Sequence, residues 1–190
     1  MSQVLTQQTR PSDDPTPYLS HPDALYEVED GVIVELPEMG VYAGIVALTL
    51  YNALHSFLLA HGLGRAVVEF VFVLDAVRDL RRRPDVAFVS FDRWPADREV
   101  PEEGDWEVVP DLAIEVVSPH DTDRQVTGKV RKYFQYGVRQ VWIVRPLDKT
   151  VYVYSSPTSV RIYGTEEELA SDLLPGFQLP VGPLFQRTLS

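Results

Sequence analysis

Residues 110–146 read PDLAIEVVSPHDTDRQVTGKVRKYFQYGVRQVWIVRP, and this stretch decides the fold class. It opens with a nearly continuous apolar run, continues at helical spacing from about Asp123 to Tyr136, and ends with a second apolar run at 140–146. Gly137 ends the helical part. Two buried strands joined by a helix form a strand–helix–strand unit. The stretch therefore predicts a mixed sheet with helices packed on it, in an α/β or α+β domain.

The residues before this stretch predict further strands and a long helix. Segment 24–38 contains two β-prone runs separated by an Asp-Gly turn, which predicts a hairpin. From 41 to 61 the apolar residues recur at helical spacing. Segments 65–74 and 84–90 are typical of strands.

The remaining segments are less regular. Residues 91–109 are rich in acidic residues and proline, which indicates a solvated excursion on the surface. Residues 149–156 alternate as a strand, and the proline-broken segment 173–185 predicts an extended strap across the core. Residues 1–22 lack a hydrophobic period and predict a flexible tail, so 23–190 is expected to form a single domain.

The composition excludes several classes of function. The chain has no cysteine, so it has neither disulfides nor a thiolate zinc site. The first residues lack the pattern of a signal peptide, and no later stretch is expected to suit a bilayer, so we expect a cytoplasmic protein with no membrane partner. The net charge of −11 argues against a general nucleic-acid coat protein. A DNA enzyme stays possible, because the potential of a cleft can differ from that of the whole molecule.

Two carboxylates occur within or at the start of apolar segments, where burial of a charge would be unfavourable. Glu115 interrupts the apolar run 112–117, and Asp85 stands at the start of segment 84–90. An ionised carboxylate is rarely buried unless it is paired or bound to a cation. Strand alternation places Glu115 on one face with Ala113 and Val117.

Two such carboxylates on neighbouring strands would suit Mg²⁺ or Mn²⁺, with the main-chain carbonyl of Val116 as a further ligand. The residues alone leave other interpretations open. Asp85 could be a turn or cap residue, and Glu115 could be an edge-strand carboxylate paired with an arginine.

The following helix carries basic residues. Lys129 and Tyr133 lie one turn apart and share a face, near Arg131 and Lys132. Ammonium groups there could contact a phosphate or polarise a water molecule. A solvent-facing helix with ordinary charges is the alternative.

Residues 110–146 resemble the core of the Uma-two family of restriction-endonuclease-like proteins, a branch of the PD-(D/E)XK nuclease superfamily. The similarity runs in order from about Ala24 to the C-terminus. Its other landmarks are the Asp30-Gly31 hairpin, the entry at 83–86, the segment 174–177 and the pair Leu184-Phe185. This resemblance implies a restriction-endonuclease-like mixed sheet flanked by helices. It also implies hydrolysis of DNA phosphodiester bonds with a divalent metal.

The resemblance implies roles for particular residues. Asp85 and Glu115 match the acidic residues of the second and third core strands. Val117 stands at the lysine of the Glu-X-Lys signature, and Lys129 matches a lysine on the next helix that substitutes for it in such proteins. Tyr42 stands where the family usually has histidine.

The resulting hypothesis is an endonuclease in which Asp85, Glu115 and the Val116 carbonyl hold Mg²⁺ or Mn²⁺. Lys129 would position the nucleophile or stabilise charge on the phosphate. Further candidate residues are Asp111 (or a strand-start residue), Glu35 (or an exposed hairpin carboxylate), Lys132 and Tyr133. The basic cluster of Arg78, Arg81, Arg82 and Arg83 predicts either contacts to the DNA backbone or a solvated loop.

Two other functions stay open. A fold relative that has lost cleavage could bind DNA or protein, which the net charge of −11 and Val117 would favour. A hydrolase of smaller phosphoesters would fit the acidic surface. For the nuclease, cutting both strands of a duplex favours a homodimer with two sites.

Overall fold

The computed structural model describes residues 24–102, 104–119 and 121–187. The predicted flexible tail, residues 1–22, lies outside them. The elements, in chain order, are β1 (Tyr26–Glu29), β2 (Val32–Glu35), α1 (Val41–His61), β3 (Gly64–Val68), β4 (Phe72–Asp75), β5 (Leu80–Arg82), β6 (Val86–Ser90), β7 (Leu112–Val116), α2 (Asp123–Gln135), β8 (Gln140–Arg145), β9 (Thr150–Ser156), β10 (Ser159–Tyr163), β11 (Glu168–Ala170), β12 (Gln178–Pro180) and α3 (Val181–Leu184).

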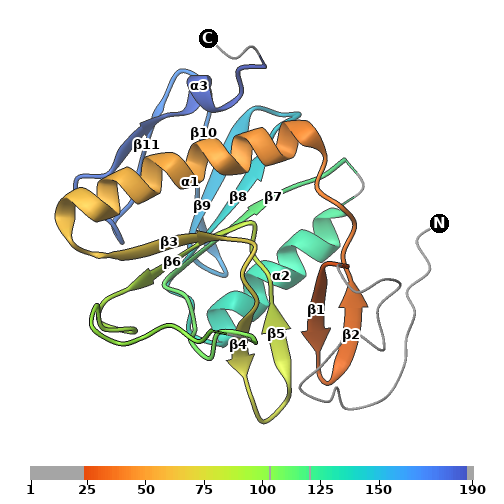
Figure 1. Cartoon of the computed structure of the whole chain (residues 1–190). Coiled ribbons are helices and arrows are strands. Elements are labelled where there is room, and N and C mark those ends of the chain that lie inside the picture. Colours follow the sequence, from red (N-terminus) through yellow and green to blue (C-terminus); the bar gives the residue numbers. More distant parts are fainter. Residues whose placement is uncertain (1–23, 103, 120, 188–190) are drawn as a thin grey trace.

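A six-stranded sheet forms the centre of the molecule, in the order β10-β9-β8-β7-β6-β3 (Figure 1). Strands β7 and β8 are parallel and are joined by α2, whereas the other neighbours are antiparallel. The structure thus confirms the predicted mixed sheet, the strand–helix–strand unit and the α+β class. A capping box at Thr122 and Gln125 fixes the first turn of α2.

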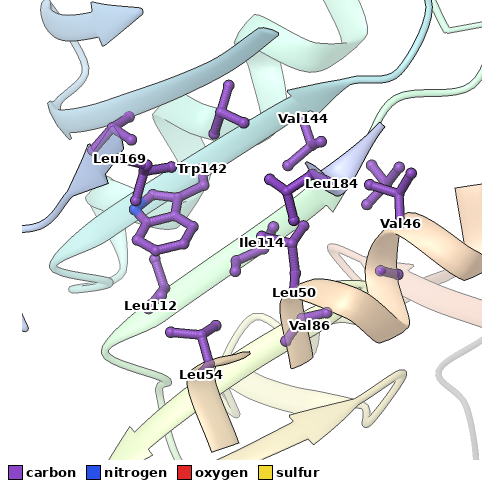
Figure 2. Packing of buried hydrophobic residues seen from close by; sticks show 14 of the residues in the cluster. Val46, Leu50, Leu54, Val86, Leu112, Ile114, Trp142, Val144, Leu169 and Leu184 are labelled. Carbon is purple, nitrogen blue, oxygen red and sulfur yellow. The ribbon is translucent and has the colours of Figure 1, made fainter. Parts of the chain in front are cut away.

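The two long helices cover opposite faces of this sheet. Even-numbered residues of β7, such as Leu112 and Ile114, pack in one apolar cluster with Leu50 and Leu54 of α1 (Figure 2). The odd-numbered Ala113 packs in a second cluster with α2. Because strand side chains alternate, the next odd position, Glu115, projects to the α2 side.

A second sheet of order β2-β1-β5-β4 lies beside the first, and β11 pairs with β12 in a third. The prediction of one strand over 65–74 is wrong. Strand β3 ends at Val68, and β4 begins at Phe72 in the other sheet. Glu69 makes the break with φ of 54°, a left-handed conformation that residues other than glycine seldom adopt.

Two irregular segments contribute more to the core than the sequence suggests. The excursion 91–109 is not solvated throughout, because Trp94 and Trp106 are buried in the α2-side cluster. The predicted strap 173–185 crosses the α1-side core, but it contains the short elements β12 and α3 rather than a continuous extended segment.

Helix α1 also corrects a prediction. Of the described helices, it alone is long and apolar enough by length and composition to span a membrane, with mean hydropathy 1.5 over 18 residues. In the structure Val46, Leu50, Leu54 and Leu58 pack on the central sheet, so one face of this apolar helix belongs to the core. Its outer face exposes Val41 and Leu59, at 83% and 73%.

Gly64 fixes how closely β3 approaches β6. Its φ is +156°, and a Cβ added there would lie 2.2 Å from the Val89 carbonyl oxygen. We expect Gly64→Ala to lower the free energy of unfolding by about 2 kcal/mol, because the strands must separate. Denaturant unfolding measures this change.

Gly128 in α2 provides the matched control. An added Cβ there meets nothing within 4 Å. Gly128→Ala is expected to stabilise the protein by about 0.5–1 kcal/mol through helix propensity. Equal effects of the two substitutions would contradict the close approach at Gly64.

Candidate functional site

Asp85 and Glu115 lie opposite each other on the same face of the central sheet. The antiparallel register of β6 and β7 pairs Val86 with Ile114 and Ala87 with Ala113. One step further, this register pairs Asp85 with Glu115. Directly opposed residues have Cβ atoms about 5 Å apart and share a face. The register therefore brings together two of the predicted metal ligands.

The main chain of Val116 adds two polar groups at the same place. Its N–H donates to Oδ2 of Asp85 at 2.5 Å, whereas the N–H of Val117 donates across to Val144 of β8. The carbonyl of Val116 therefore faces the β6 edge, where the continued register places Pro84. Proline has no N–H and gives this carbonyl no ladder hydrogen bond. The oxygen stays available to a ligand.

Glu115 is buried at 9% exposure and is held at both oxygens by α2. The ammonium group of Lys129 donates to Oε2 at 2.8 Å, and the hydroxyl of Tyr133 donates to Oε1 at 2.5 Å. Lys129 and Tyr133 thus share a helix face that is turned toward the carboxylate rather than toward solvent. A carboxylate has about four lone-pair positions, so two of them remain for other ligands.

Glu27 of β1 is a site residue that the sequence reasoning missed. Its side chain is 5% exposed, and Oε1 lies 3.3 Å from the ammonium group of Lys129. Lys129 is therefore held between Glu27 and Glu115. The segment 26–29 reads YEVE, which is also the pattern of an ordinary strand with an exposed polar face. Nothing in this pattern indicates that α2 would pack against this face of β1 and bury Glu27.

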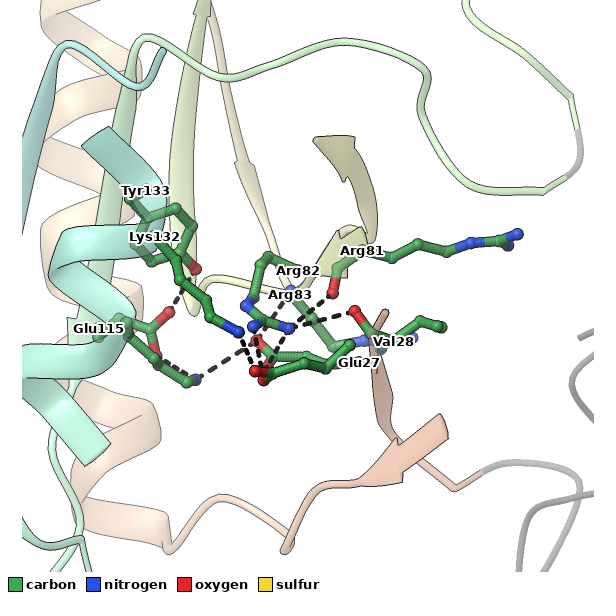
Figure 3. Close-up of polar contacts among 10 residues, drawn as sticks. Glu27, Val28, Arg81, Arg82, Arg83, Glu115, Lys132 and Tyr133 are labelled. Carbon is green, nitrogen blue, oxygen red and sulfur yellow. Dashed lines mark hydrogen bonds and ion pairs between the residues drawn. The ribbon is translucent and has the colours of Figure 1, made fainter. Parts of the chain in front are cut away.

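A second layer of ion pairs fixes Glu27 and its neighbour. The guanidinium group of Arg82 donates to Glu29 at 2.8 Å and lies 3.8 Å from Glu27 (Figure 3). Lys132 of α2 also donates to Glu29. The second sheet and α2 are thus joined by alternating charges around Lys129.

Burial and repulsion shift the proton affinities of the site. Burial first, and then the charge of Glu115, raise the pKa of Asp85 to about 8. Burial raises the pKa of Glu115 as well, although Lys129 partly offsets it. Burial opposes the charged form of Lys129, but Glu115 and Glu27 outweigh it and raise its pKa. Lys129 is therefore cationic at neutral pH. The raised pKa values of Asp85 and Glu115 mean that a further positive charge between them would be favourable.

An open cleft gives access to these groups. Its walls are the segment 36–40 that precedes α1 and the end of β7 with α2. The polar side chains that line it are Glu38, Arg83, Asp85, Glu115, Ser118, Asp121 and Lys129. The cleft also includes Val116, so all the predicted ligands and Lys129 line one cavity.

The donor set fits a hard divalent cation. Two facing carboxylates and one carbonyl without a ladder partner are the oxygen ligands that Mg²⁺ and Mn²⁺ prefer. Within the described ranges, no three His, Asp or Glu side chains are grouped closely enough to bind a metal by themselves. A cation here would therefore complete its shell with water or substrate oxygens, as Mg²⁺ commonly does.

Two further acidic candidates do not join the site. Asp111 is 1% exposed at the other end of β7, where it accepts from Ser90 N–H and pairs with Arg93 and Arg139. Four residues of strand separate it from Glu115 by about 13 Å. It stabilises the fold instead, as its strand-start interpretation implied. Glu35 is exposed at the end of β2 and is not among the residues that line the cleft.

The arginine cluster divides into different environments. The prediction that Arg82 contacts DNA is wrong, because its side chain is 3% exposed and occupied by Glu27 and Glu29. Arg81 points away from the site (Figure 3) and pairs with Asp79 and Asp105 at 2.7 Å. Arg78 bonds the Tyr136 hydroxyl. Only Arg83 of this cluster lines the cleft.

Tyr42, at the head of α1, is used structurally. Its hydroxyl donates to the carbonyl of Phe185 at 3.0 Å, and the guanidinium group of Arg187 lies 4.7 Å from its ring. These contacts tie α1 to the segment that follows α3. They give Tyr42 no place among the groups that line the cleft.

The raised pKa of Asp85 predicts that its charge opposes folding. This loss of folding stability is absent below pH about 4, where the carboxyl group is protonated in both the folded and the unfolded protein. It reaches its full size above pH about 8, where the carboxyl group is ionised in both. We expect Asp85→Asn to raise the melting temperature of metal-free protein at pH 8.5 by about 3–6 °C. The gain should vanish toward pH 4. Thermal unfolding in a chelator measures both.

Asp111→Asn is the control, because it removes a carboxylate that is paired with arginines and should lower the melting temperature. A loss of stability for Asp85→Asn at pH 8.5 would contradict the electrostatic account of the site.

Comparisons with known proteins establish the fold and the family of the chain. A crystal structure from Anabaena variabilis, described as a "putative nuclease belonging to DUF820", superposes with a TM-score of 0.73 at 20% identity. The match covers 91% of this chain and 96% of that one, and it shows a shared fold. Among curated proteins, none matches. The family model Uma2, described as "Putative restriction endonuclease", matches residues 15–182. The chain therefore belongs to the Uma2 family.

Proposed function

We propose that this protein is a divalent-metal-dependent endonuclease that hydrolyses phosphodiester bonds of DNA. The observation that carries the proposal is the pair Asp85 and Glu115, opposed on one face of the sheet and lining the same cleft as Lys129. Membership of the Uma2 family supports the nuclease class and DNA as the substrate.

Asp85, Glu115 and the Val116 carbonyl would hold Mg²⁺ or Mn²⁺. When bound, such a cation neutralises charge on the phosphate and activates the attacking water. The protein supplies the rest. Tyr133 fixes the Glu115 carboxylate, and Glu27 keeps Lys129 charged and beside the cleft. The ammonium group can then bind a phosphate oxygen whose charge grows during the reaction.

The missing lysine at position 117 has a physical substitute. Residue 117 lies on the same strand face as Glu115, where Val117 supplies no charge. Lys129 instead reaches Glu115 from α2, within 2.8 Å. The positive charge of the Glu-X-Lys signature is thus provided by the neighbouring helix.

Nicking of supercoiled DNA with Mg²⁺ or Mn²⁺ tests the proposal. We expect Asp85→Asn and Glu115→Gln each to lower the rate by at least about 100-fold, since each removes a charged ligand. Glu168→Gln, on exposed β11, is the matched control and should cleave like the parent. Equal rates for all four proteins would reject the site.

A catalytically inactive module that binds DNA or protein is the second candidate. The net charge of −11 favours it, because a strongly acidic chain is repelled overall by the phosphates of a long duplex. Calorimetric titration with Mn²⁺ distinguishes the two functions. The nuclease predicts heat of binding that Asp85→Asn abolishes, whereas a module need not bind the metal.

We also propose that the protein acts as a homodimer, since two sites are needed to cut both strands of a duplex. Helix α1 supports this, because its 21 residues include no Asp, Glu, Lys or Arg and its outer face exposes Leu48 and Leu59. In a chain of charge −11, this face would bring two copies together without repulsion.

Light scattering on the purified chain tests this assembly. We expect twice the chain mass of 21.5 kDa for the parent and the monomer mass for Leu59→Glu. Val77→Glu is the control, at an apolar position in the β4–β5 turn that is even more exposed than Leu59, and should remain dimeric. A monomeric parent would contradict the proposal.

A further inference from the structure

Arg83 is a cation without a polar partner beside an acidic site. Across residues 24–102, 104–119 and 121–187, its guanidinium group forms no ion pair or hydrogen bond, and its Nε atom is buried. Its contact is the ring of Tyr26, 5.6 Å from the guanidinium carbon. The terminal nitrogens of the adjacent Arg81 and Arg82 both pair with carboxylates, although the Nε atom of Arg82 is, like that of Arg83, buried without a partner among the described residues. A buried donor without an acceptor is costly unless a ligand supplies one.

Arg83 also forms the shared wall of two cavities. One is the cleft that holds Asp85, Glu115 and Lys129. The other, which we call the aromatic hollow, has a volume of about 410 Å³, within the usual range for a small-molecule site. Besides Arg83, the lining of the aromatic hollow includes Phe70, Val100, Glu102, Asp105 and Trp106.

The aromatic hollow has a rigid floor and an exposed wall. Trp106 is buried and stacks on Phe72 at 5.7 Å, and Trp94 meets it edge-on at 5.4 Å. Phe70 lies 6.3 Å from Trp106 and is 50% exposed. Val100 is exposed to a similar extent. The flat ring of a ligand could therefore cover the exposed Phe70 and Val100 while the buried tryptophans stay in place.

Two carboxylates line the hollow, the solvent-exposed Glu102 and the half-buried Asp105. Asp105 is neutralised by Arg81 and accepts from Tyr26, so it does not compete for Arg83. Arg83 is thus left to bind an anionic group at the boundary between the cavities. It lies two residues before Asp85 in an extended segment, about 7 Å away. An anion at Arg83 and a phosphate at Asp85 would belong to neighbouring parts of one strand.

We propose that the aromatic hollow binds a nucleobase adjacent to the scissile phosphate, with Arg83 on the connecting backbone. This inference rests on the proposed nuclease function and names its substrate class, which is single-stranded or locally unpaired DNA. A base inside a duplex is stacked on its neighbours and must leave the stack before its face can lie on the aromatic side chains of the hollow. An aromatic platform accepts any unpaired base, because every base has a π face. The net charge of −11 also favours binding of a few nucleotides over binding along many phosphates of a duplex.

Fluorescence anisotropy with the full chain tests this proposal without cleavage. A dye-labelled 12-nucleotide strand and the same strand paired with its complement are titrated in EDTA. The parent is expected to bind the single strand at least about 5-fold more tightly than the duplex. Phe70→Ala should weaken single-strand binding by at least about 5-fold and leave duplex binding unchanged.

Arg83→Ala should weaken single-strand binding and lower its salt dependence by about one counterion. The matched controls are Leu147→Ala, an exposed apolar residue of the β8–β9 turn, and Arg131→Ala, an exposed arginine of α2. Both should bind like the parent. Unchanged melting temperatures would show that Phe70→Ala and Arg83→Ala are folded.

Three results overturn the proposal: no measurable single-strand binding by the parent, tighter binding of the duplex, or parent-like binding by Phe70→Ala. Its failure is distinct from failure of the nuclease assignment. A protein that nicks DNA but is insensitive to Phe70→Ala rejects the hollow alone. A protein that binds single strands through Phe70 but never cleaves supports the hollow and rejects the nuclease.

Discussion

The antiparallel register between β6 and β7 is the constraint on which the site depends. It sets Asp85 opposite Glu115, so two carboxylates share one face within a few ångströms. A slip of either strand by one residue would move its carboxylate to the other face of the sheet, into the apolar cluster under α1. Packing opposes that slip, because Val86, Leu112 and Ile114 are fully buried in this cluster and would be replaced there by residues of the charged face. Packing of the apolar face of the sheet thus sets the strand register, and the register places Asp85 and Glu115 on the opposite face.

The electrostatics of the site follow from this pairing. Four carboxylates, Asp85, Glu115, Glu27 and Glu29, meet three cations, Lys129, Arg82 and Lys132. The partners are unevenly distributed. Lys129 pairs with Glu115 and Glu27, Arg82 pairs with Glu29 and at longer distance with Glu27, and Lys132 pairs with Glu29. Asp85 receives only a main-chain N–H among the contacts of the described residues. The negative charge of Asp85 is therefore the least compensated of the four. Its raised pKa is consistent with this, because burial and the charge of Glu115 both disfavour its ionised form. Such a local cost in stability is common where a site awaits a ligand.

Much of this could be predicted from the sequence. The apolar run around Glu115 identified both the strand and the anomalous carboxylate, and the helical period placed Lys129 and Tyr133 on one face. Those signals are local, so a single segment carries them. Glu27 and Arg82 could not be placed in this way, because their burial comes from the contact between the second sheet and α2. The arginine cluster was interpreted as one basic surface for the same reason. Side chains alternate along β5, so Arg82 points into the interior whereas Arg81 points toward the surface.

The central claim is that Asp85 and Glu115 share one divalent cation. Crystals grown with Mn²⁺ and measured at its absorption edge test this claim directly through anomalous scattering. The account predicts one peak between the two side chains, within about 2.5 Å of an oxygen from each and near the carbonyl of Val116. An empty map at this position, or a peak bound by other residues, would contradict it.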